Sequence, residues 1–292
     1  MCGCDGQQQP VHERQSQRRR ALTLCLLCIP QTCHNRPLSC LSARTAREVV
    51  FVHVELKGRR NMKVLITGAA GVIGKILLRG LRDRHELRGF DCEPMPELAD
   101  AMVGDINDFD QVKAATEGME AIIHLVNVPG GQWEHSLQSM VGTYNVFESA
   151  HQNGVRRIAY ASRGGVLPRS FYPRTMQRTA EMLPKPDSYY TISKVFGESI
   201  GYMYSSRFEM EAVSVRIGNI NAERDQPEHP HHLSHGDCVR VFEQAITHPG
   251  VKYEMVFGVS DSDWPLYDLD HGRKVIGYDP QDRSHVPEDK RE

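Results

Sequence analysis

Tyr190 and Lys194 are the side chains of this sequence whose types and spacing best fit catalysis. They lie in the segment Asp187-Ser-Tyr-Tyr-Thr-Ile-Ser-Lys194, and residues four apart on a helix share a face. An ammonium beside a phenol favours the phenolate, so it would lower the phenol pKa from about 10 toward neutral pH. Tyr190 is therefore a candidate general base for a hydroxyl, or acid for a carbonyl. An exposed helix can also carry such a pair by chance.

A glycine-rich stretch about 120 residues earlier gives the pair a context. Val64, Leu65 and Ile66 form an apolar run typical of a buried parallel strand. The pattern G-x-x-G-x-x-G follows it, formed by Gly68, Gly71 and Gly74. In such a turn the glycines allow a tight bend, close approach to a pyrophosphate and packing of the helix on its strand, and the helix N-terminus favours the phosphates. The stretch predicts a nucleotide site.

An acidic residue at the end of the next expected strand indicates which dinucleotide binds. Asp91 ends the run 87–91 and follows Gly74 by 17 residues, where a carboxylate accepts both hydroxyls of an adenosine ribose. It would repel a 2′-phosphate, which favours NAD over NADP. A third strand over 102–106 ends in Asp105 and Ile106, expected beside the adenine. Lys194 is then expected to hydrogen-bond the nicotinamide ribose.

Strand and helix patterns alternate from residue 62 onward. Further strands are expected over 121–126 and 157–162, and helices over 72–84, 108–117, 134–152, 188–206 and 234–246. Asp108 is expected to cap the second of these helices, and a Ser234/Asp237 capping box is expected to start the last. This order predicts an α/β fold, a Rossmann-type doubly wound parallel sheet with a small C-terminal substrate-side lobe. Ligands of such sheets bind at the carboxyl ends of the strands.

Three divisions of the chain follow from these patterns. Residues 1–61 lack periodicity and are expected to be a disordered or mis-assigned N-terminal extension, in which Cys25-x-x-Cys28 has no partner pair for a zinc site. Residues 62–218 are expected to form the NAD-binding Rossmann domain with the Tyr/Lys pair. Residues 219–292 are expected to form the small lobe, with Trp264 and Tyr267 as packing anchors and a disordered charged tail from Asp282.

Composition limits the partners. The chain has 292 residues, is 40% hydrophobic and carries a formal net charge of −2, so neither nucleic acid nor a membrane is expected as a partner. Six of its eight cysteines precede residue 62, and the remainder reads as a reduced, cytoplasmic protein. A histidine cluster formed by His229, His231, His232 and His235 is expected to face substrate or pack a loop rather than bind metal, because hydride transfer with a Tyr/Lys pair needs none.

These motifs together resemble a known family. The chain from Met62 to about Asp282 is similar to extended short-chain dehydrogenases/reductases of the NAD-dependent epimerase/dehydratase superfamily. Within it, the segments ending at Gly218 (Val-Arg-Ile-Gly), Asp237 (Ser-His-Gly-Asp) and Glu198 (Tyr-x-x-Ser-Lys-x-Phe-Gly-Glu) resemble uronate dehydrogenases and related sugar dehydrogenases. The resemblance implies Tyr190 as acid/base and Lys194 as its electrostatic partner. It implies contacts to NAD from Gly68, Gly71, Val72, Ile73, Asp91, Asp105 and Ile106.

Two departures from the family bear on the chemistry. The family places a catalytic serine second in a Ser-Ser pair after the fifth strand, and here the pair reads Ser162-Arg163. Ser162 is the expected substitute if the strand end bulges, and Arg163 is the alternative group to polarise the carbonyl. The loop after Gly218 also lacks the arginine that holds the carboxylate of a uronate, since Arg224 is out of register. A uronate, a neutral sugar and a polyol all remain open as substrate.

The sequence supports one leading function and two alternatives. The leading one is an NAD-dependent oxidoreductase that transfers hydride between NAD and a sugar or sugar-acid hydroxyl. The alternatives are a nucleotide-sugar epimerase/dehydratase and a non-catalytic dinucleotide-sensing protein. The apolar band of the helix over 188–206 is broader than one sheet face requires, and in the resembling family this helix contributes to a four-helix bundle, which implies a homodimer.

Overall fold

A computed structural model describes residues 61–223 and 225–291. The expectation for the N-terminal extension, Asn61 apart, and the position of Arg224 lie outside the described residues.

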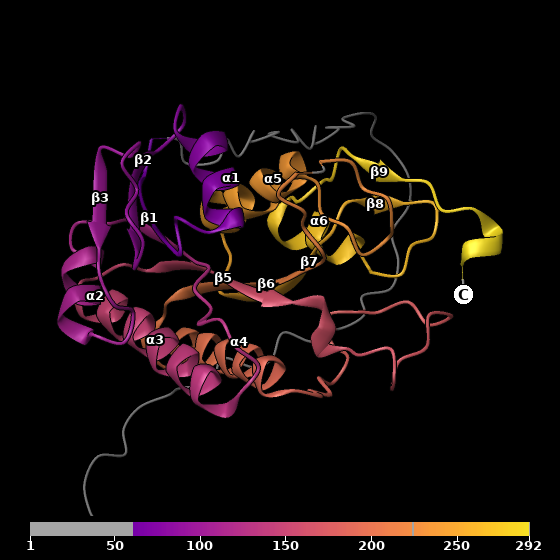
Figure 1. Cartoon of the computed structure of the whole chain (residues 1–292), viewed down its shortest axis with the longest axis horizontal. Helices are drawn as coiled ribbons and strands as arrows, with labels where there is room; N and C mark the ends of the chain where they lie inside the picture. The colour runs from indigo at the N-terminus through magenta and orange to yellow at the C-terminus, as the bar shows by residue number, and fades with distance from the viewer. Residues whose placement is uncertain (1–60, 224, 292) are drawn as a thin grey trace, which may run out of the picture. The chain divides into compact units, whose positions relative to one another are not determined.

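A seven-stranded sheet runs through the centre of the described chain (Figure 1). Its order is β3-β2-β1-β4-β5-β6-β7, and every neighbouring pair is parallel. The strands are β1 Lys63–Thr67, β2 Glu86–Asp91, β3 Asp100–Val103, β4 Ala121–His124, β5 Arg157–Arg163, β6 Glu211–Ile217 and β7 Tyr253–Gly258. The order reverses direction between β1 and β4, which makes the carboxyl ends of these two strands the switch point where such sheets bind ligands. The predicted Rossmann-type α/β sheet is confirmed.

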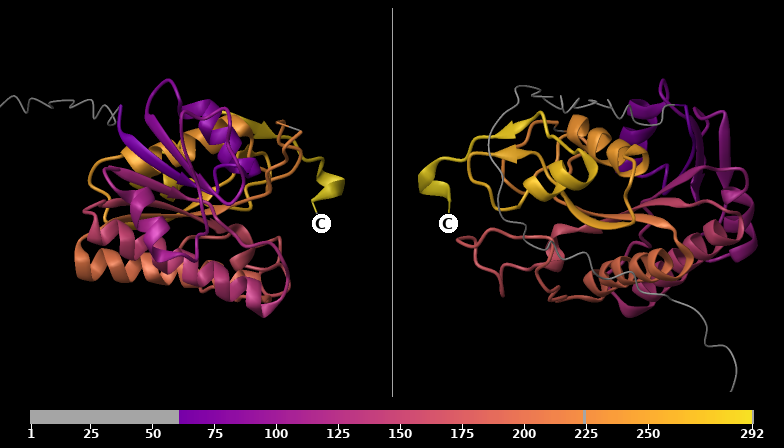
Figure 2. Two further views of the ribbon diagram at one scale, coloured as in Figure 1. Left: turned by 60° about the vertical axis from the view of Figure 1, so that its left-hand side comes forward. Right: turned by 180° about the vertical axis from the view of Figure 1, so that it is seen from behind.

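Helices cover both faces of the sheet (Figures 1 and 2). One face carries α1 Val72–Leu81, α5 His235–Thr247 and α6 Asp270–Ile276, and the other carries α2 Phe109–Thr116, α3 Trp133–Gln152 and α4 Tyr189–Phe208. Asp108 and Ser188 cap α2 and α4, because their side chains accept hydrogen bonds from backbone N–H groups of the first turn.

Two separate cores result from the alternation of side chains along the strands. In β1, Val64 and Ile66 face the α1 and α5 side, whereas Leu65 faces the α2, α3 and α4 side, and all three are fully buried. The continuous apolar runs that predicted a parallel sheet are therefore explained by burial on both faces.

One strand ends earlier than its sequence predicts. The third strand was expected over 102–106 but covers only Asp100–Val103. It pairs with β2 up to Asp91, and the next peptide, Gly104, donates its N–H to the Asp91 carbonyl before the chain turns. Asp105 then accepts from the backbone N–H of Asn107, so Asp105 and Ile106 lie in a turn after the strand.

The part of the chain after Gly218 contributes both to the central sheet with its covering helices and to the region beside the carboxyl ends of the strands. Helix α5 and strand β7 lie in the sheet layers, so the boundary expected at residue 218 falls between adjacent strands of one sheet. The rest of this C-terminal part includes a small parallel pair, β8 Asp261–Ser262 and β9 Arg283–Ser284. Two short 3₁₀ turns also occur in the described chain, at Gly164–Val166 after β5 and at Glu288–Lys290 near the C-terminus.

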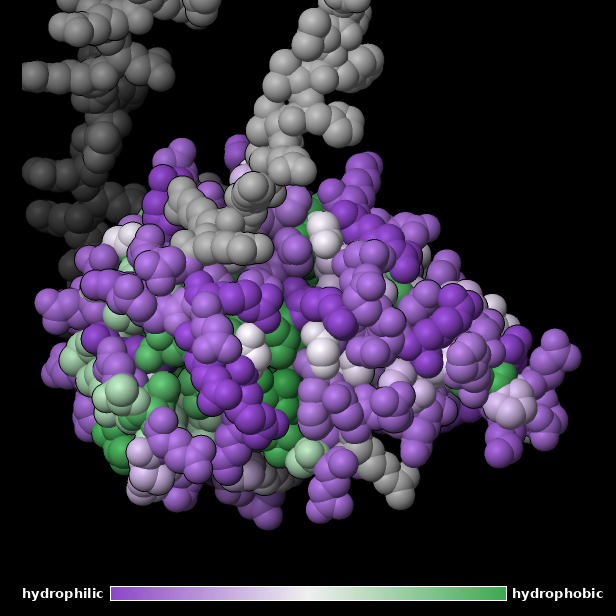
Figure 3. All heavy atoms as spheres, turned by 90° about the horizontal axis from the view of Figure 1, so that it is seen from above, coloured by the Kyte–Doolittle hydropathy of each residue, from purple (hydrophilic) through white to green (hydrophobic). Residues whose placement is uncertain are grey.

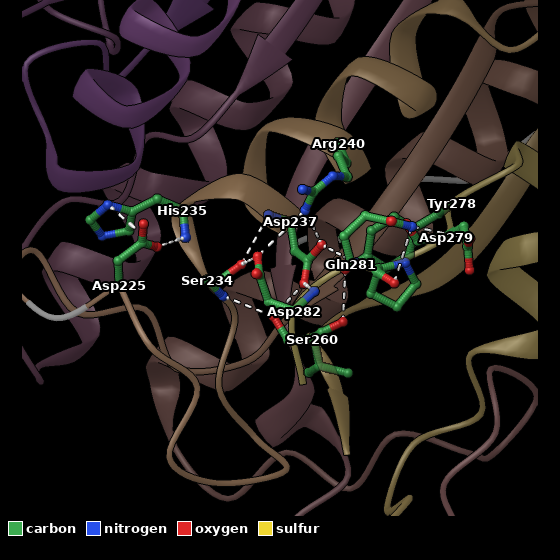
Figure 4. A network of polar contacts seen from close by, with 12 residues as sticks. Asp225, Ser234, His235, Asp237, Arg240, Ser260, Tyr278, Asp279, Gln281 and Asp282 are labelled. Atoms are coloured by element: carbon green, nitrogen blue, oxygen red, sulfur yellow. Dashed lines mark hydrogen bonds and ion pairs between the residues drawn. The ribbon is translucent and has the colours of Figure 1, made fainter. Parts of the chain in front are cut away.

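A buried carboxylate joins this C-terminal part to α5 (Figure 4). Ser234 caps the helix by accepting from the Asp237 N–H at 3.0 Å, as expected, but its own N–H donates to Ser260 and not to Asp237. Asp237 instead accepts from the Ser260 hydroxyl and from the backbone N–H groups of Gln281 and Asp282. The predicted capping box is thus only half formed, because the carboxylate holds the C-terminal segment.

The charged tail is more ordered than its composition predicts. Val286 is buried and its N–H donates to the Asp263 carboxylate at 2.9 Å, and Ser284 is fully buried beside Ser262. The expectation of disorder from Asp282 is therefore wrong as far as Val286, because these residues fill the space beside β8.

The surface over α1 and α5 is mostly covered by hydrophilic side chains, with hydrophobic ones visible between them (Figure 3). In the described ranges, no helix has both the length and the apolar composition that a membrane crossing requires.

Candidate active site

Two adjoining cavities open at the carboxyl ends of the strands. The smaller one, about 780 Å³, lies at the ends of β2 and β3, and the larger one, about 1270 Å³, lies at the ends of β5 and β6. Gly68, Gly71, Leu125 and Asn127 line both, so the two cavities meet at the glycine turn.

The predicted site residues all line one or both of these cavities. The smaller cavity is lined by Gly68, Gly71, Asp91, Asp105 and Ile106, and the larger one by Gly68, Gly71, Val72, Ile73, Gly74, Ser162, Arg163, Tyr190 and Lys194.

The glycine turn has the geometry that its spacing predicts. Gly68 has φ +76°, in the left-handed region that favours glycine. A Cβ at Gly74 would lie 2.4 Å from the Gly68 carbonyl oxygen, so only glycine lets the helix approach the strand this closely. No side chain caps the start of α1 and its first turn holds no acidic residue, which leaves the helix N-terminus available to an anion.

Asp91 is held in place at the end of β2. One carboxylate oxygen accepts from the Ala70 N–H at 2.9 Å and the other from the Glu93 N–H at 3.1 Å. These bonds attach the carboxylate to the glycine turn while it lines the smaller cavity. Together, the uncapped helix end, the close Gly74 packing and the positioned carboxylate fit a dinucleotide whose adenosine lies at the ends of β2 and β3.

Tyr190 and Lys194 lie on the first two turns of α4, facing the larger cavity. The Lys194 ammonium is 5.6 Å from the centroid of the Tyr190 ring and 5.4 Å from that of Tyr160. Lys194 is only 4% exposed, and burial, with a smaller contribution from the charge of Arg163, lowers its pKa to about 8.

The expectation that Lys194 lowers the pKa of Tyr190 is wrong. Burial raises the pKa of Tyr190, and the cation that partly offsets this is Arg163. The guanidinium carbon of Arg163 lies over the ring, 5.0 Å from its centroid. Desolvation outweighs the charges because the phenol is in a largely buried position on the helix.

Ser162 and Arg163 have different surroundings. Ser162 is 3% exposed and its hydroxyl donates to Glu198 at 2.7 Å. Glu198 in turn forms a bidentate ion pair with the fully buried Arg216, at 2.8 and 2.9 Å. Strand β5 pairs regularly with β6 through Arg163, so the bulge that would turn Ser162 toward Tyr190 is not formed.

Arg163 instead extends along the cavity wall. Its guanidinium donates to the Thr191 hydroxyl at 3.5 Å and packs on Tyr190. A Cβ at Gly165 would lie 2.6 Å from the guanidinium, so the glycine leaves the room that this side chain occupies.

Arginines that the sequence reading did not single out line the same cavity. Arg169, Arg174 and Arg178 come from the irregular segment between the first 3₁₀ turn and α4. Arg178 is 1% exposed and donates to the carbonyls of Leu167, Met176 and Tyr172. Three arginines within ten residues of a segment without strand or helix pattern were the available signal.

Three of the four histidines of the cluster line this cavity, and the fourth, His235, instead bonds to the Asn221 carbonyl. His229, His231 and His232 line it, and His231 Nδ1 shares a 2.7 Å hydrogen bond with the Tyr267 hydroxyl. Burial lowers the pKa of His231 to about 3, so the ring is neutral. Among the described residues, no group of three or more His, Cys, Asp or Glu side chains could hold a metal ion.

The two aromatic residues expected to anchor packing differ in burial. Tyr267 is buried against Phe257, whereas Trp264 is only partly buried and lies beside His229 and under Arg174.

Comparison with known proteins places this site in context. Residues 64–245 match the NAD dependent epimerase/dehydratase family. The chain is 34% identical to an NAD-dependent glucose-6-phosphate dehydrogenase of Haloferax volcanii over 249 residues, 76% of this chain and 94% of that protein. It is also 34% identical to a uronate dehydrogenase of Pseudomonas putida, with 77% of this chain and 85% of that protein covered.

A solved structure agrees with the sequence comparison. The crystal structure of uronate dehydrogenase from Agrobacterium tumefaciens superposes with a TM-score of 0.71 at 30% identity, covering 76% of this chain and 85% of that one.

Proposed function

The chain belongs to the NAD dependent epimerase/dehydratase family, and from this premise we propose that it oxidises a hydroxyl of a sugar to a carbonyl. It is an oxidoreductase and its cofactor is NAD. The observation that carries the proposal is the Tyr190/Lys194 pair in the wall of the larger cavity, which meets the smaller cavity at the glycine turn.

The side chains divide the work as follows. Tyr190, as its phenolate, takes the proton of the substrate hydroxyl and becomes the neutral phenol, and Lys194 holds the nicotinamide ribose. NAD, when bound, accepts the hydride from the same carbon. Gly68, Gly71, Val72, Ile73 and Gly74 hold the pyrophosphate. Asp91 accepts from the adenosine ribose, while Asp105 and Ile106 flank the adenine.

The substrate we propose is a sugar that carries an anionic group. Among the described residues, seven charged side chains line the larger cavity: five cations (Arg163, Arg169, Arg174, Arg178 and Lys194) and two carboxylates (Asp187 and Glu228). This excess of positive charge raises the local concentration of anions. The relatives named above act, by name, on glucose 6-phosphate and on uronates, both anionic sugars.

A panel of candidate substrates tests the function. Formation of NADH, followed at 340 nm, is measured with glucuronate, galacturonate, glucose 6-phosphate, glucose and a polyol. We expect turnover with at least one anionic sugar and a much lower kcat/KM with its neutral counterpart. Arg169→Ala should raise the KM for the anionic sugar and leave that for the neutral one unchanged. Absence of NADH with every sugar would contradict the proposal and favour a dinucleotide sensor.

A nucleotide-sugar epimerase or dehydratase has less support. The dehydrogenase relatives match nearly the full described chain, and the proposed reaction produces net NADH. An epimerase recycles its cofactor, so NAD released only on denaturation, without net NADH, would favour that alternative.

Assembly and location are also proposals. We propose a homodimer formed through α3 and α4, whose outer surfaces expose Trp133, Leu137, Val141 and Tyr144 on α3 and Tyr189 and Ile192 on α4. The segments 219–233 and 259–287 act as the substrate-side lobe. The free thiols of Cys92 and Cys238 support a reducing, cytoplasmic location.

A further inference from the structure

We propose that Arg163 is a catalytic residue of this protein, which donates hydrogen bonds from its guanidinium to the substrate oxygen that Tyr190 deprotonates. The inference rests on the proposed dehydrogenase function and names the group that polarises the reacting oxygen.

Arg163 is the last residue of β5. The strand keeps regular parallel pairing to its last residue, so consecutive side chains alternate between the two faces. Ser162 therefore points to α4, where it donates to the buried Glu198–Arg216 ion pair. Turning the hydroxyl toward Tyr190 would remove its hydrogen bond to the buried Glu198 carboxylate, so Ser162 is held by that bond.

The Arg163 guanidinium lies over the Tyr190 ring, with its carbon 5.0 Å from the ring centroid, and lines the larger cavity. Its one hydrogen bond to a side chain in the described chain is the 3.5 Å contact with Thr191, and no carboxylate there forms an ion pair with it. A guanidinium carries five N–H groups, so it keeps donors for a ligand oxygen.

Oxidation of the hydroxyl places negative charge on the oxygen that Arg163 contacts. In the oxidation, the hydroxyl proton passes to the Tyr190 phenolate and then to solvent, the C–H bond breaks as hydride leaves for NAD, and the C–O bond becomes a double bond. The oxygen gains negative charge while its proton leaves, and a fixed cation stabilises that charge. The positive charge of Arg163 also favours the phenolate beneath it.

Four of the ionisable groups of this region line the larger cavity with Tyr190 or lie directly behind it. They are Arg163 at the end of β5, Lys194 on α4, Asp187 before α4, and the buried Tyr160 behind Lys194. Arg163 is the one whose positive charge lowers the pKa of Tyr190.

Two variants at this position, measured on the full chain, test the proposal. Arg163→Ala should lower kcat by about 10²–10³-fold with a smaller change in KM, as for the loss of one donor to a developing oxyanion. Added guanidinium chloride at non-denaturing concentration should restore part of that loss. Arg82→Ala, an exposed arginine after α1, is the matched control and should show neither effect. An unchanged kcat in Arg163→Ala, or a higher kcat in Arg163→Ser, would overturn the proposal.

A third variant moves the guanidinium without removing it. Gly165→Ala puts a Cβ within 2.6 Å of the present guanidinium position, where only the flexible end of Arg163 must shift. We expect an unchanged melting temperature and a lower kcat. Equal loss of stability and activity would instead assign Arg163 a structural role.

A measurement without turnover separates this proposal from the proposed function. The phenolate absorbance of Tyr190 is titrated near 295 nm as the difference between the protein and Tyr190→Phe. Arg163→Ala should move the titration to higher pH. If no sugar is oxidised but the titration moves, the proposed function fails while the coupling of Arg163 to Tyr190 stands; if it does not move, the coupling fails.

Discussion

Lys194 is buried and Tyr190 partly buried in the wall of the larger cavity, and burial shifts their pKa values in opposite directions. It raises the pKa of the phenol and lowers that of the ammonium to about 8. Both shifts favour the neutral forms, and the charge of Arg163 favours the Tyr190 phenolate but disfavours the Lys194 ammonium.

Removal of the phenol oxygen is the most direct test of its role. Tyr190→Phe should lower kcat by about 10²–10⁴-fold, the range that general acid–base catalysis contributes. Binding of NAD, measured by calorimetry, should change little because the ring keeps its packing. Tyr189→Phe, on the exposed neighbour, is the matched control and should retain kcat. A Tyr190→Phe protein with full activity would exclude the phenol as acid/base.

The buried Lys194 also predicts how stability depends on pH. The folded state loses the lysine proton near pH 8, whereas an unfolded lysine keeps it to about pH 10.4. Between these values the unfolded state binds more protons, so this group makes stability rise with pH across that window. Below pH 8 the folded protein bears the full cost of the buried charge.

Replacing Lys194 with a neutral side chain should reveal the free-energy cost of its buried charge. Lys194→Met should be more stable than the unsubstituted protein at pH 7, by up to about 3 kcal/mol, and the difference should shrink as pH rises from 8 to 10. Urea unfolding at a series of pH values measures it, with Lys252→Met, an exposed site, as control. A difference that stays constant across the series would contradict the assignment.

Side-chain spacing predicted the site's location better than its chemistry. The glycines, Asp91 and the Tyr/Lys pair are set by local sequence, and they line the two cavities at the carboxyl ends of the strands. The orientation of Ser162 depended on whether β5 bulges, and the place of Arg169 in the cavity wall depended on a segment with no periodic pattern. Neither can be read from local spacing, because both are decided by tertiary contacts.

Among the helices, the N-terminus of α4 controls the position of the reacting phenol. Ser188 accepts from the Thr191 N–H at 3.2 Å and fixes the first turn, which carries Tyr190. Ser188→Ala should cost about 0.5–2 kcal/mol of stability and also lower kcat. Asp108→Ala removes the cap of α2, away from the larger cavity, and should cost a similar stability with kcat retained. Chemical denaturation and steady-state kinetics distinguish the two.

The Glu198–Arg216 pair connects α4 to β6 inside the molecule. Glu198→Ala leaves the fully buried Arg216 without its carboxylate and should destabilise the fold by about 3–5 kcal/mol. A Glu198→Leu/Arg216→Met double variant removes both charges and should cost less than the single variant. Urea unfolding compares them, and a double variant as unstable as the single one would mean that packing, not charge, sets the cost.

Element boundaries followed the sequence where a cap or a hydrogen-bonded partner is local. Ser188, Asp108 and Ser234 each precede the helix they cap, as their residue types predict. The early end of β3 and the order of the tail up to Val286 were missed, since each depends on a partner distant in sequence, Asp91 for one and Asp263 for the other.

For the assembled fold, the outer surface of α3 is the feature that predicts association. Trp133, Leu137, Val141 and Tyr144 recur every three to four residues and are each at least 40% exposed, which places an apolar stripe along the helix. Such a stripe favours contact with a second copy of the chain.

A charge placed in that stripe tests the association. Tyr144→Glu should convert a dimer into a monomer in light scattering at micromolar concentration, with the secondary structure retained. Arg82→Glu, a charge reversal at an exposed position directly after α1, should leave the mass unchanged. A monomeric unsubstituted protein would contradict the dimer.

Because glycine has no side chain, Gly165 bears on the order in which residues 163 and 165 were replaced during evolution. A serine at position 163 is short enough to coexist with any small residue at 165, whereas the arginine present now overlaps the volume of even one additional methyl group. Glycine at 165 is thus permissive for the arginine, and a mutational path that installs glycine first keeps each intermediate free of a clash. The two positions are expected to show epistasis, with each replacement's effect on turnover depending on the identity of the other.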